Sequence, residues 1–198
     1  MSATSAPFGL RPAFHPSGLD RAQALANGIP SGFNTDIFKG QPVRYQTTAI
    51  GGTIGTITPA TTSGAWSGAF AGVQWTDTTG RARVSNTWPA NTAYTTGSCV
   101  AYFYNDQNIV YEIQADGSMA QTSIGNEYNF TNVTVGSTTT GLSQATLGSG
   151  TAVGNAAQGQ MRVVDIAPYP GNDWGDSYTI VRVVNANSQF FGAVTAIA

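Results

Sequence analysis

The apolar residues of this chain occur in short runs, and Gly, Pro, Asn or Asp interrupts each run before it reaches about a dozen residues, the length of a stable isolated helix. The clearest runs are residues 43–45, 70–75, 161–166 and 178–184. They are rich in β-branched and aromatic side chains, which are typical of strands. Many short strands with this punctuation are typical of all-β folds. We therefore predict a β-sandwich or barrel of short antiparallel strands with little helix.

Residues 99–104 and 109–114 form the strongest pair of candidate strands. The polar residues 105–108 separate them, and a four-residue loop of this kind commonly joins the two strands of a hairpin. We predict an antiparallel hairpin here. The single cysteine, Cys99, stands at its start and is expected to be buried as a small apolar side chain.

The first 32 residues differ in character from the rest of the chain. Prolines fix their own φ angles and bias the preceding residues away from helix at Pro7, Pro12, Pro16 and Pro30. A short helical turn is expected only at residues 20–26, where Asp20 would cap an Ala-rich segment. We predict an extended N-terminal arm over residues 1–32 and a single β-rich domain over residues 33–198.

Charged residues make up 9% of the chain, against roughly 25% in ordinary soluble domains. The chain has eight Lys and Arg residues, of which Lys39 is the single lysine, and ten Asp and Glu residues, so the net charge is −2. Disordered chains combine high net charge with few aromatic residues, and this chain has the opposite composition. Because these few cations are scattered along the chain, they are not expected to form a phosphate-binding patch. We therefore do not expect nucleic acid as a partner.

The N-terminal residues show no basic segment followed by an apolar run, and no stretch approaches the roughly 18 apolar residues of a membrane span. We therefore expect neither a signal peptide nor a membrane partner, and we expect synthesis in the cytoplasm.

The residues that usually carry catalysis are scarce. His15 is the only histidine and lies in the Pro-rich arm, whereas a catalytic imidazole must be held rigidly by a third group. Cys99 would need the same histidine as its base. Zinc and iron sites need several His or Cys ligands. We therefore predict that the chain is not an enzyme and has no cofactor and no metal.

Asp173 and Asp176, with Trp174 between them, form the one candidate carboxylate pair. Such a pair beside an aromatic ring suits glycoside hydrolysis, and hard oxygen ligands also suit calcium. The simpler interpretation is a tight loop whose Asp side chains bond backbone amides. We favour the loop.

Five stretches together resemble a family of structural proteins in the virions of tailed bacteriophages: residues 8–18, 73–81, 84–91, 108–117 and 170–178. In some phages these proteins are capsid decoration, or cement, proteins. The resemblance implies a place on the outer capsid surface, the major capsid protein as partner and no catalytic residues. A homotrimer would suit the three-fold junctions of a capsid lattice.

A cement protein binds where capsid subunits meet, and the arm offers side chains for such contacts. The predicted partner-binding residues are Phe8, Leu10, Arg11, Pro12, Phe14, His15 and Pro16. Apolar side chains among them would fill pockets on a neighbour. The alternative is that the arm folds back and covers an edge of its own sheet.

Two other functions stay open. A tail or fibre protein that binds carbohydrate would use aromatic rings, and the candidates are Trp66, Trp75, Trp88 and Trp174. Since these residues lie within or beside strands, we expect burial for them. A head–tail connector or tail-tube subunit would instead assemble into a ring.

Overall fold

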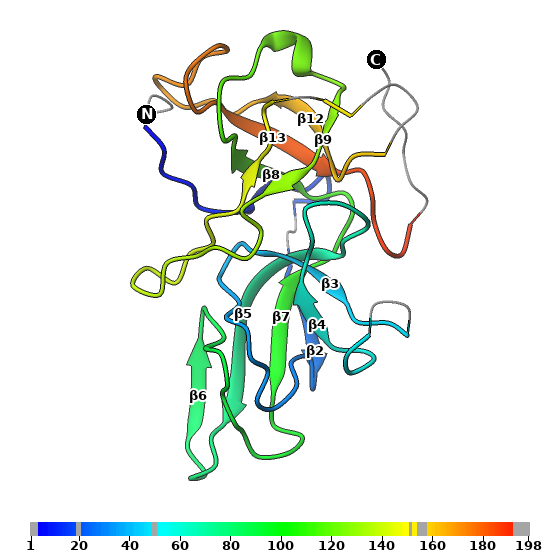
Figure 1. The fold of residues 1–198 in the computed structure, drawn as a ribbon, viewed down its shortest axis with the longest axis vertical. Coiled ribbons are helices and arrows are strands. Elements are labelled where there is room, and N and C mark those ends of the chain that lie inside the picture. Colours follow the sequence, from blue (N-terminus) through cyan, green and yellow to red (C-terminus); the bar gives the residue numbers. More distant parts are fainter. Residues whose placement is uncertain (1–3, 19–20, 49–50, 151, 154–157, 192–198) are drawn as a thin grey trace.

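The computed structural model describes residues 4–18, 21–48, 51–150, 152–153 and 158–191. Within these residues the chain is built from short β-strands, and its one helical element is a single 3-10 turn, η1 (Gln121–Ser123). The prediction of an all-β fold of short antiparallel strands is confirmed (Figure 1). No helix among the described residues is both long and apolar enough to cross a membrane.

A five-stranded antiparallel sheet forms the upper half of the molecule in Figure 1. In order across the sheet its strands are β1 (Arg11–Phe14), β8 (Val110–Gln114), β13 (Ile180–Asn185), β12 (Met161–Ile166) and β9 (Glu127–Tyr128). The sheet therefore joins the first described strand of the chain to the last.

A six-stranded antiparallel sheet forms the lower half. Its order is β2 (Gln23–Ala26), β7 (Val100–Tyr104), β5 (Gly68–Thr76), β3 (Pro42–Tyr45) and β4 (Ile57–Pro59), while β6 (Ala82–Ser85) pairs with the far end of β5. A small separate pair consists of β10 (Phe130–Thr131) and β11 (Thr146–Leu147).

Two hydrophobic clusters pack against these sheets, and β5 contributes to both. Ala69 belongs to the cluster that covers the inner face of the five-stranded sheet, which includes Tyr111 and Val183. Phe70 and Val73 of β5 belong to the second cluster, with Trp88. Successive residues of a strand face opposite sides. A single strand therefore ties the two cores together.

The predicted hairpin at residues 99–114 is wrong, because its two strands belong to different sheets. β7 pairs with β2 and β5, and β8 pairs with β1 and β13, so both edges of each strand are taken by other partners. Residues 105–108 carry the chain from one sheet to the other. A short polar loop between two strands is compatible with a hairpin and with a change of sheet alike.

The predicted helical turn at residues 20–26 is also wrong over its described part. Residues 23–26 are strand β2, which pairs with β7 from Gln23 opposite Phe103 to Ala26 opposite Val100. Such a short segment cannot hold a helix by propensity alone, and the pairing with β7 decides its conformation. The proposed cap, Asp20, lies outside the described residues.

Buried and half-buried amide side chains replace backbone partners where the strands are irregular. Gln189 Oε1 accepts the backbone N–H of Tyr45 at 2.7 Å, and its Nε2 donates to the Tyr45 carbonyl at 3.1 Å. Gln160 accepts the Phe130 N–H at 3.0 Å and donates to the Thr61 carbonyl at 3.0 Å. Similar side-chain bonds to the backbone are made by Gln41, Gln114 and Asn172. These uncharged groups satisfy buried polar backbone without bringing charge into the interior.

Candidate interaction surface

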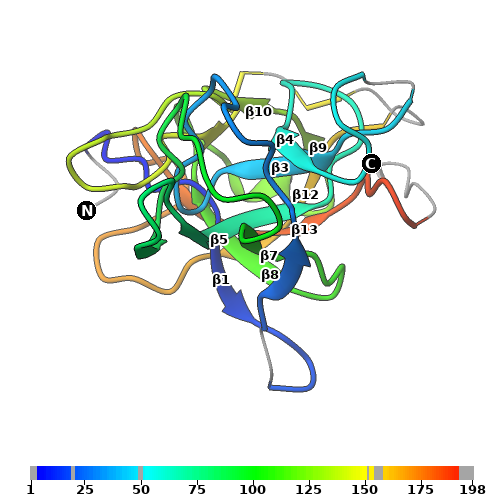
Figure 2. The same ribbon diagram turned by 90° about the horizontal axis from the view of Figure 1, so that it is seen from below.

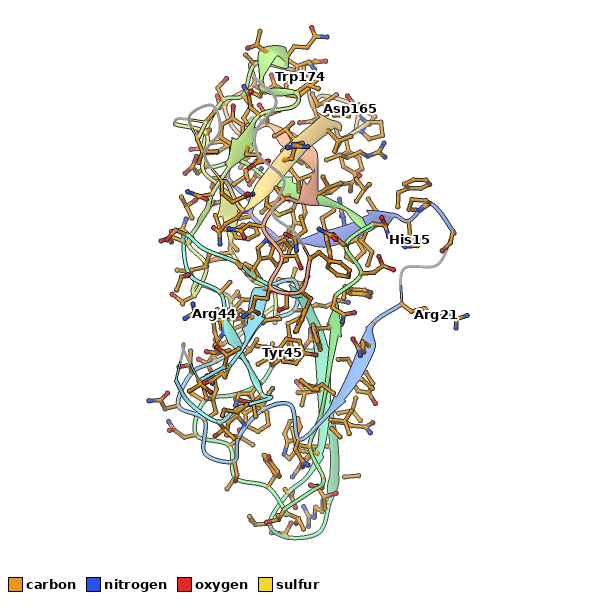
Figure 3. All side chains as sticks on the ribbon, turned by 90° about the vertical axis from the view of Figure 1, so that its right-hand side faces the viewer. His15, Arg21, Arg44, Tyr45, Asp165 and Trp174 are labelled. Atoms are coloured by element: carbon orange, nitrogen blue, oxygen red, sulfur yellow. The ribbon has the colours of Figure 1, made fainter. Side chains whose placement is uncertain are left out.

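The described part of the N-terminal arm lies on the body of its own chain. β1 adds an edge strand to the five-stranded sheet, and β2 adds one to the six-stranded sheet. The arm is extended, as predicted. Of the two arrangements considered, it shows the one in which the arm folds back and covers edges of its own sheets. The described residues between β1 and β2, which include His15 and Arg21, stand out from the body (Figures 2 and 3).

Two glycines allow the arm to cross the body at close range. The Leu10 N–H donates to the Gly40 carbonyl at 2.7 Å. Gly9 and Gly40 both have positive φ, +71° and +79°, and a Cβ at Gly9 would lie only 2.5 Å from the Gly40 oxygen. A side chain is therefore excluded on steric and on conformational grounds. The crossing fixes Leu10, which is 2% exposed and belongs to the core.

A buried carboxylate holds β1 in place on the outer face of the five-stranded sheet. Glu112 is 4% exposed and lies in register with Arg11 of β1 on one side and Arg182 of β13 on the other. Arg11 donates to Glu112 Oε2 at 2.9 Å, and Arg182 Nε lies 3.5 Å from Oε1. The Arg11 guanidinium also covers the Phe8 ring at 4.6 Å. The carboxylate is thus compensated by two cations.

Tyr169, from the loop between β12 and β13, completes this cluster. Its hydroxyl donates to the Glu112 carboxylate and accepts a bond from Arg11 at 2.6 Å. Burial, followed by the bond to Glu112, raises the pKa of the Tyr169 hydroxyl above its usual value of 10.0. The phenol therefore stays protonated and acts as a hydrogen-bond donor over the whole physiological range.

A cavity of about 320 Å³ opens where the arm meets both sheets; we call it the arm cavity. The arm contributes Phe8, Leu10, Arg11 and Pro12 to its lining. The body contributes Lys39, Gly40, Phe70, Tyr104 and Leu142. Its floor is apolar and buried, whereas Lys39 and Arg11 are exposed. The lining includes two cations and no carboxylate.

His15 ties the far end of β1 to the loop that joins the two sheets. Its Nε2 lies 3.1 Å from Asp106 Oδ2, and its Nδ1 accepts the Ser17 N–H at 3.1 Å. Because Nδ1 accepts, the neutral ring carries its proton on Nε2 and donates it to Asp106. The Asn108 backbone N–H, and to a lesser extent the contact with His15, hold the pKa of Asp106 below its usual value.

The Ser17 hydroxyl also lies 2.6 Å from His15 Nδ1, so Ser17, His15 and Asp106 stand in one hydrogen-bonded row. Sequence reasoning did not find a group that orients His15, because Asp106 is 91 residues away. The Ser17 hydroxyl and the Ser17 N–H share one ring nitrogen, as in a local side-chain turn. We assign the row a tethering role, and the absence of enzymatic activity stays a prediction.

Exposed aromatic rings mark a second surface near this tether. Phe14, Phe190 and Phe191 are 56%, 61% and 54% exposed. Phe190 and Phe191 line a hollow of about 450 Å³ together with residues 105–108. The Phe190 ring packs edge-on against Tyr45 at 5.0 Å, which fixes its orientation. We call Phe190 and Phe191, with this hollow, the C-terminal aromatic patch.

The predicted partner-binding residues thus fall into two groups. Phe8, Leu10, Arg11 and Pro12 line the arm cavity, and Leu10 is not available to a partner because it is buried in its own core. Phe14, His15 and Pro16 lie at the protruding end of the arm. The sequence analysis did not predict the residues of the body that line the cavity. Lys39, as the single lysine of the chain, was the one feature that could have indicated them.

The candidate carboxylate pair is a loop, as favoured from the sequence. The Asp173 N–H donates to Asp176 Oδ2 at 2.9 Å, and the Asp176 N–H donates to the Asp173 carbonyl at 3.2 Å. Among the described residues, no cluster of three or more His, Cys, Asp and Glu side chains has a geometry that would hold a metal ion.

Trp66 and Trp88 are fully buried, as expected, so neither can stack on a sugar, whereas Trp75 and Trp174 are only half-buried. Cys99 is buried too, and burial raises the pKa of its thiol. No family model, curated protein or solved structure matches this chain.

Proposed function

We propose that this chain is a structural virion protein of the capsid decoration type, which binds the outer surface of a phage capsid as a trimer and stabilises contacts between major capsid subunits. The C-terminal aromatic patch is the observation that carries the proposal. Phe190 and Phe191 are adjacent in the chain, are both more than half exposed and line one hollow, on a body that carries few charged side chains. Clustered exposed rings of this kind are typical of protein–protein contacts.

The low charge of the chain supports the same function. A soluble monomer relies on surface charge to stay dispersed, whereas a subunit of an assembly covers much of its surface with neighbours. Each aromatic side chain that a neighbour buries fully contributes about 1.5–3 kcal/mol. Many copies on one shell multiply that modest gain.

The locked arm supports a rigid docking body. The Glu112 cluster and the Gly9–Gly40 crossing fix residues 8–14 against the two sheets. A preformed surface loses little conformational entropy when it binds. The protein would then act as a rigid clamp across a subunit junction.

Sedimentation with capsid shells tests the proposal. Shells of the phage whose genome encodes the chain, prepared without it, are mixed with purified protein and pelleted. We expect saturable binding and shells that resist heat or low salt better than bare shells. Absence of binding to expanded shells would contradict the proposal.

The two alternatives predict different results. A connector or tail-tube subunit would bind tails or form rings and leave the shell bare. A carbohydrate-binding fibre protein would bind sugars on a glycan array, and of the four tryptophans proposed for that purpose only Trp75 and Trp174, both half-buried, are accessible.

A further inference from the structure

We propose that the arm cavity is a socket for an acidic, apolar segment of the capsid partner, in which an aromatic or aliphatic side chain enters the cavity and a neighbouring carboxylate pairs with Lys39. This inference rests on the proposed function and deepens it by naming the chemistry of the partner.

The arm cavity has an apolar floor. Leu10 and Phe70 form a floor that is almost fully buried, while Phe8 and Leu142 are half-buried beside it. A floor of this kind is complementary to one apolar side chain and gives little to a polar one.

The rim of the arm cavity carries positive charge. Lys39 is the only lysine of the chain, its side chain is exposed, and among the described residues it makes no ion pair. Arg11, the other cation of the lining, is already paired with Glu112, which also faces Arg182. Lys39 is therefore the unpaired cation in a lining that holds no carboxylate, and it favours an anionic group on the partner at this point.

The backbone around the cavity is held rigidly. Gly40 lies in the lining itself, where it accepts the Leu10 N–H at 2.7 Å and donates to the Phe70 carbonyl at 2.7 Å. These bonds join arm, turn and β5 at one point. The walls are therefore preformed, and binding requires no rearrangement of the backbone.

A small probe tests the socket without the capsid. 3-Phenylpropionate carries a phenyl ring and a carboxylate, and 3-phenylpropionamide is its neutral match. We expect the carboxylate to shift the amide NMR signals of Lys39, Gly40 and Leu142 in a saturable way, with the amide binding more weakly. Equal binding of the two probes, or no saturable shift at these residues, would overturn the inference.

Charge-reversal variants give the matched control. Lys39→Glu changes an exposed side chain at the socket, and Arg21→Glu makes the same charge change on the protruding segment. We expect Lys39→Glu to weaken 3-phenylpropionate binding by about threefold or more, and Arg21→Glu to leave it unchanged. Equal effects of both variants would show a general charge effect and overturn the inference.

The same variants in the shell-binding assay separate the two proposals. If the wild-type chain binds shells and Lys39→Glu binds them equally well, the socket fails and the decoration function stands. If the wild-type chain does not bind shells but takes the carboxylate probe at Lys39, the decoration function fails and the cavity remains a site for apolar carboxylates.

Discussion

Glu112 shows how one residue can decide where a whole segment lies. Its neighbours in β8, Tyr111 and Ile113, face the core. Because side chains alternate along a strand, the sequence indicates only that Glu112 points away from the core. The structure places it between Arg11 and Arg182, beneath the Tyr169 hydroxyl. A residue that composition would assign to the surface is therefore buried, because its partners come from two other strands and a loop.

Replacing Glu112 with Gln should destabilise the protein. The amide leaves Arg11 and Arg182 without a counter-charge, and because Arg11 is half exposed we expect a loss of about 1–3 kcal/mol in the free energy of unfolding. Urea denaturation measures the loss. Asp173→Asn is the control, since it removes the same charge from an exposed side chain. Similar midpoints for the two variants would contradict the role of Glu112.

Asp77 should titrate abnormally at the tip of the β5–β6 hairpin. It accepts bonds from the Thr79 hydroxyl and the Arg81 N–H and pairs with Arg83, which holds the pKa of the carboxyl well below its usual value of 3.8. A lowered folded pKa means that the ionised group stabilises the turn above the unfolded pKa. That stability is lost as the pH falls from about 4 towards the folded pKa. NMR titration of the side chain checks this, and a midpoint at or above 3.8 would contradict it.

At the scale of elements, the sequence predicts strands more reliably than it predicts their partners. The runs at residues 43–45, 70–75 and 161–166 appear as β3, β5 and β12. Alternation and turn residues are local signals, so they locate a strand but not the sheet that receives it. For this reason the loop at residues 105–108 is wrongly predicted as a hairpin turn. The error at β2 has another cause, because its Ala-rich sequence favours helix and only the pairing with β7 makes it a strand.

The crossing of the arm over the body depends on Gly9. Gly9→Ala should cost about 2 kcal/mol or more, because it combines a positive φ with a Cβ 2.5 Å from the Gly40 oxygen. Hydrogen exchange should show lost protection of the Leu10 amide, which donates to Gly40. Gly18→Ala is the matched control, since Gly18 has φ +74° and no atom within 4 Å of its Cβ position. Equal effects would mean that backbone strain alone matters.

The arm is an integral part of both sheets, so truncation is a poor test of its role in binding. Deletion of residues 1–30 would remove β1, β2 and the core residue Leu10. Loss of binding in such a truncation would report unfolding rather than a missing contact. Point substitutions of exposed side chains are the appropriate variants.

At the scale of the whole molecule, the fold creates surfaces that no segment of the sequence contains. The arm cavity joins Phe8, Lys39, Tyr104 and Leu142, which are spread over more than half of the chain. The sequence indicated the arm side of this surface through its apolar residues. It could not indicate the body side, because the contact depends on a pairing of strands that local patterns do not determine.

The C-terminal aromatic patch should matter for assembly and little for folding. Phe190→Ser with Phe191→Ser should lower the affinity for capsid shells by about tenfold or more, because both rings are largely exposed in the isolated chain. Pelleting at several protein concentrations measures the affinity. Val84→Ser, at a side chain that is 82% exposed on β6, is the control. If the control lowered the affinity as much as the double variant, the patch would have no special role.

Electron cryomicroscopy of the phage that encodes this chain would show where in the virion the protein lies. We expect density for this fold on the outer surface of the capsid, with three copies around the junctions between major capsid subunits and the C-terminal aromatic patch facing a neighbour. Density for the chain in the tail, in a connector ring or inside the shell would contradict the decoration function.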